Sequence, residues 1–304
     1  MKKNVLSLFD GISGLQLALK KSKIDINQYY ASEINQSAIN VTQHHFPNTI
    51  QLGDVSKINS TNIPKIWLLS AGSPCQDLSI AGKRRGMSTI NQEIISYSQY
   101  LKMKSKGHQF QGQSYLFWEF IRLYNELKPK YFFLENVRMT DKWKNIISRE
   151  LNCQPILINS SDHSIQNRER YYWTNIPNVS IPKNKSILLS NVIPNAIAGY
   201  GIRGTNKGNL NPDGSIKWEQ NGTTRQDFKA NCITTKKSST SKVKLNDGSI
   251  RSVTVSEAET LQNLPKNYTK VKGVSEVDRW HAIGNGWTIN VVSHLLKGLK
   301  KLDK

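Results

Sequence analysis

Short apolar runs alternate with amphipathic stretches along roughly the first half of the chain. Runs such as VLSLF at 5–9 and YFFLE at 131–135 are typical of strands, and the stretches between them have the spacing of helices. The expected strands are Val5–Phe9, Tyr29–Ala31, Thr49–Leu52, Ile66–Ala71, Tyr131–Leu134 and Pro155–Ile158, and the expected helices include Leu15–Lys21, Gln36–His45, Leu116–Leu127 and Lys142–Leu151. This order predicts an α/β fold with a doubly wound, mostly parallel sheet.

Two segments interrupt the alternation. The first, from Gly82 to Gln113, is too long for an ordinary connection, and its Lys and Arg residues are opposed by a single acid, Glu93. Such a segment is either functional or disordered, and its charge suits contact with phosphate. The second, from about Ser180 to Ser275, lacks a strong helical period and is also basic. It predicts a second, smaller domain of short strands and loops, with a flexible basic insertion as the alternative.

A helical pattern returns after the second segment. Apolar residues between Trp287 and Leu299 recur at helical spacing and could pack against the first domain. We therefore expect one domain from residues 1–178 plus 276–304 and a second from residues 179–275.

The composition of the chain indicates which kinds of binding partner to expect. The 304 residues include 42 Lys or Arg against 22 Asp or Glu, a formal charge of +20 that favours polyanions, although a solvated basic surface would give the same excess. Three cysteines are too few for a disulfide framework or a four-thiolate metal site. No apolar run approaches the length of a membrane span, and the first residues do not look secretory. We expect a cytoplasmic protein without a metal.

Acidic and glycine residues follow the first three expected strands. The turn DGISG at 10–14 lets a ligand approach the backbone, but it lacks the GxGxxG spacing of a pyrophosphate site. Glu33 and Asp54 stand where acids accept hydrogen bonds from ribose hydroxyls and an adenine amino group. A glycine turn alone is as often structural as ligand-binding, and Glu33 or Asp54 alone is more often a helix cap. The ordered set predicts an adenosine-containing cofactor.

Candidate catalytic residues follow the fourth and fifth strands. Most free cysteines are small core residues, but Cys75 lies at a central strand end in SPCQ, among polar and basic residues that favour the reactive thiolate. Glu135 ends the next strand, as a general acid or a structural cap. Arg168 and Arg170 in QNRER suit phosphate and carbonyl oxygens, or form surface ion pairs.

In this order, the motifs resemble those of DNA (cytosine-5) methyltransferases. They are FDGISG at 9–14, Glu33, GDV at 53–55, GSPCQ at 72–76, ENV at 135–137, QNRER at 166–170, RSVTVSEAETLQNLP at 251–265 and GNGWT at 284–288. The resemblance implies a doubly wound S-adenosylmethionine-binding catalytic domain and a second, smaller basic target-recognition domain. It also implies a monomer that acts sequence-specifically on double-stranded DNA, as in restriction-modification or phage systems.

The resemblance implies individual roles as well. Cys75 would add to carbon 6 of a flipped cytosine, Glu135 would act at ring nitrogen 3, and Arg170 would hold the carbonyl, with Arg168 supporting the loop and phosphates. The implied cofactor-binding residues are Phe9, Gly11, Ile12, Gly14, Glu33, Ile34, Asp54, Val55, Leu116, Asn285, Gly286 and Trp287, although core packing explains Trp287 equally well. The implied DNA-binding residues are Gln76, Ser79, Lys83, Arg84 and Arg85.

Some features depart from the pattern or leave alternatives open. The stretch between GKRRG and SYLFWEF is longer than in the family, so its residues receive no family role, and extra DNA contacts or a mobile catalytic loop are both expected of it. An RNA (tRNA) cytosine-5 methyltransferase is the nearest rival, because one branch of the family modifies transfer RNA. A non-catalytic DNA-binding protein of the same fold is a second rival, against which the intact Cys75 and Glu135 argue. The recognition sequence and a companion nuclease stay open.

Overall fold

The chain divides by its internal contacts into two compact units. The computed structural model describes residues 2–78, 86–183, 187–210, 216–237 and 241–300, with the backbone alone described for 202–210 and 216–221. The first unit comprises Met1–Ile158, Glu169–Ile181 and Val292–Lys304, and the second comprises Asn159–Arg168 and Pro182–Val291.

These units differ from the predicted boundaries in three places. Residues 159–168 and 276–291 belong to the second unit by their contacts, whereas the sequence pattern placed them in the first domain, and residues 179–181 belong to the first unit instead of the second domain. Hydrogen bonds explain the difference, because Gln166 bonds to Leu261 and Ile233, and Arg168 bonds to Gly284.

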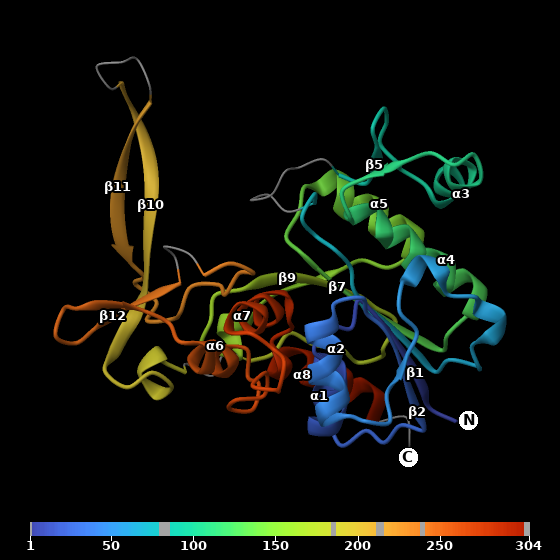
Figure 1. The fold of residues 1–304 in the computed structure, drawn as a ribbon, viewed down its shortest axis with the longest axis horizontal. Helices are drawn as coiled ribbons and strands as arrows, with labels where there is room; N and C mark the ends of the chain where they lie inside the picture. Colours follow the sequence, from blue (N-terminus) through green and yellow to red (C-terminus); the bar gives the residue numbers. More distant parts are fainter. Residues whose placement is uncertain (1, 79–85, 184–186, 211–215, 238–240, 301–304) are drawn as a thin grey trace. The chain divides into compact units, whose positions relative to one another are not determined.

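The first unit is built on a seven-stranded sheet in the order β3-β2-β1-β4-β7-β9-β8. The strands are β1 (Asn4–Leu8), β2 (Gln28–Ser32), β3 (Ile50–Gln51), β4 (Leu68–Gly72), β7 (Tyr131–Val137), β8 (Ile156–Asn159) and β9 (Glu169–Thr174). Strands β3, β2, β1, β4 and β7 pair in parallel, and β9 runs antiparallel to β7. The chain fills the sheet outward from β1 in both directions, so the predicted doubly wound, mostly parallel α/β core is confirmed (Figure 1).

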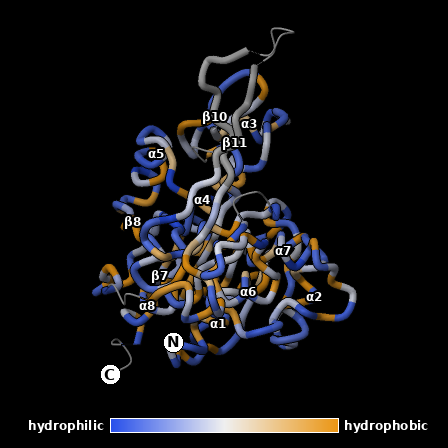
Figure 2. The backbone as a smooth tube through the Cα atoms, turned by 90° about the vertical axis from the view of Figure 1, so that its left-hand side faces the viewer, coloured by the Kyte–Doolittle hydropathy of each residue, from blue (hydrophilic) through white to orange (hydrophobic). Residues whose placement is uncertain are grey.

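Helices cover both faces of this sheet. They are α1 (Gly14–Lys21), α2 (Gln36–His45), α4 (Phe117–Leu127), α5 (Asp141–Leu151) and α8 (Ile289–Lys300), which enters the unit from the second one, with short 3-10 helices η1 (Val55–Lys57), η2 (Ser60–Asn62) and η3 (Ser114–Leu116). Alternate strand residues such as Leu6, Leu69 and Phe132 share one buried cluster with α4 and α5. Figure 1 shows α1 and α2 on the other side of the sheet. Apolar positions recur along β7 and α8 in Figure 2.

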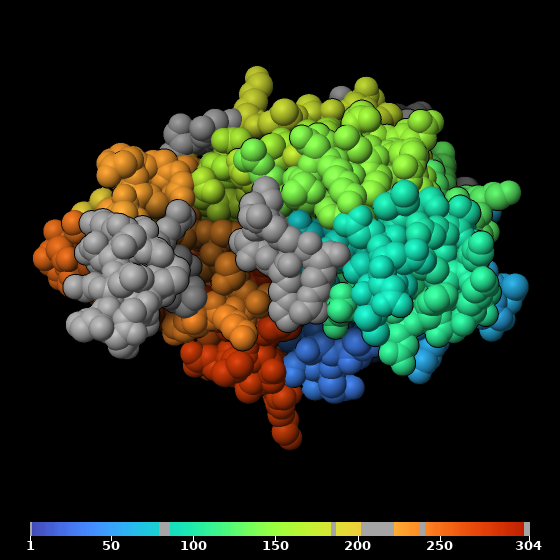
Figure 3. Space-filling view, turned by 90° about the horizontal axis from the view of Figure 1, so that it is seen from above, coloured from blue at the N-terminus to red at the C-terminus, as the bar shows by residue number. Residues whose placement is uncertain are grey.

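The long basic segment before α4 is folded where the structure describes it. Residues 86–113, called the inserted segment below, contain β5 (Ser88–Thr89), β6 (Phe110–Gln111) and α3 (Tyr97–Ser105). Met87, Ile94, Tyr100 and Met103 are buried in the same cluster as α4 and α5. Figure 3 shows its cyan surface meeting the yellow-green surface of α5, where Lys142 pairs with Glu93. Of the two interpretations of the segment, disorder is therefore wrong for these residues.

The second unit contains a four-stranded antiparallel sheet in the order β11-β10-β12-β13. Its strands are β10 (Ala196–Leu210), β11 (Ile216–Thr224), β12 (Lys242–Leu245) and β13 (Ile250–Ser252), with η4 (Ser160–Asp162), η5 (Leu189–Asn191), α6 (Val255–Leu261) and α7 (Glu276–Asn285). β10, with 15 residues, and β11, with 9, are longer than the short strands that the sequence predicts. Helix α6 was not predicted, although Thr254 and Glu257 form a capping box at its start. Across the described ranges, no helix combines the length and apolar character needed to cross a membrane.

A close helix contact gives a first testable prediction. A Cβ on Gly298 of α8 would lie 2.1 Å from the carbonyl oxygen of Pro177 and 2.8 Å from Cγ2 of Ile176. Alanine normally stabilises a helix by ~1 kcal/mol relative to glycine. Here we expect the opposite sign, because Gly298→Ala must displace backbone, with a loss of ~1–3 kcal/mol in the free energy of unfolding.

Urea denaturation measures this change. Lys297→Ala is the control, because Lys297 is exposed on the same helix turn. A Gly298→Ala variant as stable as the wild type would contradict the close packing.

Candidate active site

The catalytic candidates lie at the carboxyl ends of two paired strands. In the parallel β4–β7 register, Gly72 lies opposite Glu135. The chain then leaves β4 through Ser73 and Pro74 to Cys75, which is partly exposed. Asn136 is buried and donates from Nδ2 to Oγ of Ser73 at 2.8 Å, with a longer bond to the Ser73 carbonyl. The strand pairing and this amide therefore hold the two motifs, GSPC and ENV, at one sheet edge.

Glu135 and Arg170 form an ion pair at this edge. Nε of Arg170 lies 3.0 Å from Oε1 of Glu135, and both side chains are largely buried. Arg170 sits on β9 opposite Val137, which places it beside the end of β7. The pair presents a carboxyl group and a guanidinium side by side, a combination that can hydrogen-bond adjacent acceptor and donor atoms of a planar ligand.

A buried aspartate, which the sequence reasoning missed, fixes the loop after Cys75. Oδ2 of Asp77 accepts from the amide of Gln113 at 3.1 Å, and the amide of Asp77 donates to Oγ of Ser114 at 3.1 Å. A Cβ on Gly112 would lie 2.1 Å from the same Oδ2, and Gly112 has a φ of +69°. The end of the inserted segment is thus fastened to the PCQD loop. Gly112 between two glutamines was the only sequence signal of a tight turn there.

The turn after β1 has open space for a ligand. Phe9 and Gly11 have positive φ angles of 55° and 57°, and a Cβ on Gly11 would meet nothing within 4 Å. Ile12 is buried and Gly14 begins α1. The backbone therefore curves away from the strand end and leaves open space beside Gly11.

Glu33 is held beside this turn by backbone amides. Its Oε2 accepts from Gly11, and its Oε1 accepts from Ile34 and Asn35, each at 2.8 Å. Asn35, not Glu33, caps α2. Ile34 is 73% exposed, an unusual state for isoleucine that gives an apolar surface next to the carboxylate. These features fit a ribose hydroxyl on Glu33 and the flat face of a base on Ile34.

Asp54 and Val55 occupy the next strand end. Asp54 caps η1 by accepting from the amide and hydroxyl of Ser56. Burial raises its pKa, but the Ser56 hydrogen bonds and the charges of Lys57 and Lys104 outweigh burial and hold the pKa below the usual value. Val55 is buried, and Leu116 at the end of η3 packs on the same core cluster. An ionised acid at this end could accept from an amino group.

Asp10, in the same turn as Gly11, carries a strongly shifted pKa. Ser13 and Tyr29 both donate to its carboxylate. Enclosure of the carboxylate raises the pKa from 3.8 to about 6, against these hydrogen bonds and with a further contribution from Glu33. The sequence reasoning gave Asp10 no role, because burial of a turn carboxylate has no local sequence signal.

The remaining cofactor candidates and one arginine belong to the second unit. Arg168 donates to the carbonyls of Gly284 and Gly286 at 3.1 and 2.9 Å and to that of Ile233 at 2.9 Å. Arg168 is only 4% exposed, and these bonds attach it to the loops around Asn285, Gly286 and Trp287. They fit the expected support of a loop by Arg168, and its phosphate contact stays a prediction. Trp287 is half-buried.

Most of the expected DNA contacts cannot be placed. Gln76 is exposed in the turn after Cys75. Ser79, Lys83, Arg84 and Arg85 lie outside the described residues.

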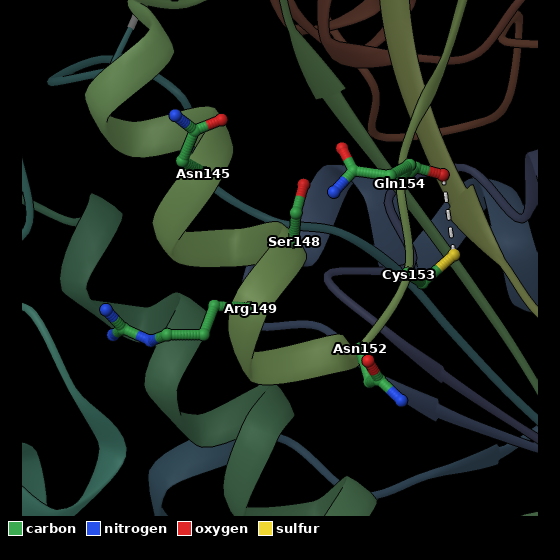
Figure 4. A pocket seen from close by; sticks show the side chains of 6 residues that line it. All are labelled: Asn145, Ser148, Arg149, Asn152, Cys153 and Gln154. Carbon is green, nitrogen blue, oxygen red and sulfur yellow. Dashed lines mark hydrogen bonds between the residues drawn. The ribbon is translucent and has the colours of Figure 1, made fainter.

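One open cavity lies apart from these residues. It has a volume of about 280 Å³ at the junction of α5 and β8 and is lined by Asn145, Ser148, Arg149, Asn152, Cys153 and Gln154 (Figure 4). Figure 4 shows Ser148 on the side of α5 that faces Gln154, whereas Arg149 points to the opposite side. Among the described residues, no group of three His, Cys, Asp or Glu side chains could hold a metal.

The fold and this site define an α/β protein with a cysteine, an acid and an arginine at the carboxyl edge of its parallel strands. Residues 3–197 match the family of C-5 cytosine-specific DNA methylases. The chain belongs to that family.

Curated relatives agree with the assignment. The orphan methyltransferase M.SPBetaI of Bacillus phage SPbeta is 33% identical over 199 residues, 56% of this chain and 44% of that protein. The type II methyltransferase M.NlaIV of Neisseria lactamica is 28% identical over 218 residues, 63% of this chain and 46% of that protein. The chain thus matches less than half the length of these relatives.

Solved structures show the same fold along the whole chain. The Entamoeba histolytica methyltransferase EhMeth has a TM-score of 0.64 at 18% identity, with coverage of 100% of this chain and 99% of that one. A mutant of Spodoptera frugiperda DNMT2 has a TM-score of 0.67 at 18% identity, with coverage of 98% and 100%. At this identity the likeness concerns the fold alone.

Asp10 gives a prediction about pH. Its folded pKa of about 6 exceeds the unfolded value of 3.8, so the folded state holds its proton more tightly. The resulting stabilisation is complete below pH 3.8 and is lost as pH rises through 6. When the pH rises from 5.0 to 7.5, the free energy of unfolding of the wild type should fall by ~1 kcal/mol more than that of Asp10→Asn, which has no carboxylate at this position.

Urea titrations at the two pH values measure this difference. Asp25→Asn, which removes an exposed carboxylate of the same unit, should follow the wild type. Equal pH dependence in Asp10→Asn and wild type would refute the assignment.

Gly112 gives a prediction about the loop after Cys75. Gly112→Ala must accept both a positive φ and the clash with Asp77, whereas Gly107 has a φ of +70° with nothing within 4 Å of its Cβ position. Alanine at either glycine costs ~1 kcal/mol for the backbone. We expect Gly112→Ala to lose a further ~1–3 kcal/mol of unfolding free energy because of the clash. Thermal or urea unfolding compares the two variants, and equal losses would show that Asp77 does not hold the segment.

Proposed function

We propose that the protein transfers a methyl group from S-adenosylmethionine to carbon 5 of a cytosine in double-stranded DNA. The observation that carries the proposal is the β4–β7 register, which brings the GSPC loop beside Glu135, together with the 3.0 Å pair between Glu135 and Arg170. Within this family, these groups are the ones needed for covalent activation of cytosine.

Cys75 supplies the nucleophile. Carbon 5 of cytosine is a weak nucleophile, and addition of a thiolate to carbon 6 turns the ring into an enamine whose carbon 5 is electron-rich. A new S–C6 bond forms as the C5–C6 double bond opens. After carbon 5 has been methylated, loss of its proton to a base re-forms the double bond and expels the thiolate. The thiol is regenerated, so the cysteine acts catalytically.

Glu135 and Arg170 act on the other side of the ring. Negative charge that enters at carbon 6 is drawn toward ring nitrogen 3 and the carbonyl oxygen. Glu135, after it has taken up a proton from solvent, donates that proton to nitrogen 3, and the guanidinium of Arg170 donates a hydrogen bond to the oxygen. Their mutual ion pair holds each in place before the base arrives. The side chain of Glu135 is about 10% exposed, so little water competes with the base for it.

The turn after β1 and the acids at the next two strand ends hold the cofactor in this proposal. S-adenosylmethionine, when bound, supplies the methyl group on a positively charged sulfur. Gly11 leaves room beside its backbone, Glu33 accepts from the ribose, and Ile34 with Asp54 and Val55 receives the adenine. These roles follow from the family motifs and fit the open space and exposed apolar surface described above.

Duplex DNA is the favoured substrate. The formal charge of +20 suits a polyanion, and the curated relatives in bacteria and phages are named as orphan or type II methyltransferases. We propose that the second unit reads the target sequence and that the target base leaves the stack to reach Cys75. The full-length likeness to a DNMT2 structure keeps RNA as a second substrate to test.

The test is incubation of the protein with methyl-labelled S-adenosylmethionine and either duplex DNA or total transfer RNA, followed by mass spectrometry of the nucleosides. The proposal expects 5-methyldeoxycytidine from DNA. Label found only in 5-methylcytidine from RNA would contradict DNA as the substrate. No label in either nucleic acid would contradict the proposed methyltransferase activity.

Cys75→Ala gives a sharper prediction about the chemistry. The variant should lose methyl transfer by at least about a thousandfold, because no covalent step remains. It should keep its affinity for the DNA duplex, measured by fluorescence anisotropy, because one small side chain leaves the basic surface intact. Cys153→Ala, in the same unit but apart from the site residues, is the matched control and should retain activity. Methyl transfer by Cys75→Ala at a rate near that of the wild type would contradict the covalent mechanism.

A further inference from the structure

A fully buried carboxylate joins the inserted segment to α4. Glu119 is 0% exposed, and its Oε1 accepts from the hydroxyl of Tyr100 and the ammonium of Lys104, both on α3. Burial and the Glu119 hydrogen bond raise the pKa of Tyr100, so its hydroxyl stays protonated and donates. A buried carboxylate requires such donors, since an unpaired one is strongly destabilising.

The other oxygen of the Glu119 carboxylate binds Arg122, which in turn contacts the turn that contains Asp54 and Val55. Oε2 of Glu119 accepts from Nε of Arg122 at 2.6 Å, and Nη1 of Arg122 pairs with Glu126 at 2.9 Å. Nη2 of Arg122 donates to the carbonyl oxygen of Val55 at 3.1 Å. The chain of contacts therefore runs from α3 through α4 to the turn that contains Asp54 and Val55.

Aromatic packing supports the same connection. Tyr115 stacks on Phe110 with ring centroids 4.6 Å apart and planes at 16°, and Phe110 packs on Tyr100 at 5.2 Å. The charge of Lys104 acts on Asp54, whose pKa it helps to lower. Burial raises the pKa of Tyr115, and the charge of Asp54 adds to this effect. Lys104 of the inserted segment and Tyr115 just after it are thus close enough to Asp54 for their charges to interact.

We propose that the inserted segment, through Tyr100 and Lys104, positions the Asp54–Val55 turn and so sets the affinity for the adenosine end of the cofactor. This inference rests on the proposed function. Lys104 and Tyr100 are positioning residues: they act through Glu119 and Arg122. The lysines of α3 and its end differ in their surroundings: Lys102 and Lys106 are exposed, whereas Lys104 pairs with the buried Glu119.

The physical argument is competition for Arg122. With Lys104 and Tyr100 in place, Glu119 is satisfied on both oxygens, and Arg122 can share its guanidinium with Glu126 and Val55. When one donor is removed, Oε1 of the buried carboxylate keeps a single partner and draws Arg122 away from its other contacts. The Val55 carbonyl then loses its partner, and the turn loses its fixed position.

The experiment compares Lys104→Met with Lys102→Met, which removes an exposed charge from the same helix. Calorimetric titration with S-adenosylhomocysteine, the cofactor without its methyl group, measures the affinity. We expect Lys104→Met to weaken binding by about three- to tenfold, the effect of one lost hydrogen bond, and Lys102→Met to leave it unchanged. Lys104→Arg should restore most of the affinity.

Steady-state kinetics and DNA binding exclude a merely structural effect. Lys104→Met should raise KM for S-adenosylmethionine with kcat nearly unchanged. Its DNA affinity, and the dependence of that affinity on salt, should equal those of the wild type. Equal cofactor affinity in Lys104→Met and wild type would overturn the inference, as would a loss of affinity shared by Lys102→Met. A wild-type protein that binds no S-adenosylhomocysteine would instead overturn the proposed function. Tyr100→Phe provides an independent variant with the same expected sign.

Discussion

The parallel pairing of β4 with β7 is the constraint on which the candidate site depends. Parallel strands bring their carboxyl ends to one edge, and the register sets Gly72 opposite Glu135. A shift of one residue would turn the acid to the other face of the sheet and separate it from the cysteine loop. Asn136 secures this register with side-chain bonds to Ser73, and β9 adds Arg170 from the far side of β7.

The inserted segment contacts two of the loops that form the candidate site. Its far end is tied to the cysteine loop by Asp77, and its helix is tied to the Asp54 turn by Glu119 and Arg122. The first tie ends just before η3, and the second runs through α4 itself, a helix buried along most of its length. A loop that must hold a reactive thiol is thereby supported by packed secondary structure.

The sequence predicts the sheet well because the signals there are local. The runs from Val5 and from Tyr131 are apolar on both faces, as in a buried parallel strand, and each expected strand of the first unit is present within a few residues. The strand pattern placed Cys75 and Glu135 at strand ends, and the structure brings Glu135 into contact with Arg170.

Other features depend on distant partners and could not be predicted in this way. Glu119 looks like an ordinary helical acid in FWEF, and only the fold reveals its burial under α3. Arg168 stands two residues from Arg170, yet its guanidinium serves carbonyls more than sixty residues away. The assignment of residues 159–168 and 276–291 to the second unit has the same origin.

Covalent capture tests the central claim most directly. In a duplex whose target base is 5-fluorocytosine, carbon 5 carries fluorine in place of the proton that must leave, so the thiolate cannot be expelled after methyl transfer. The account predicts a stable protein–DNA adduct, formed only with S-adenosylmethionine, that peptide mass spectrometry locates at Cys75. An adduct at Cys153 or Cys232, or methylated DNA with no adduct at all, would contradict it.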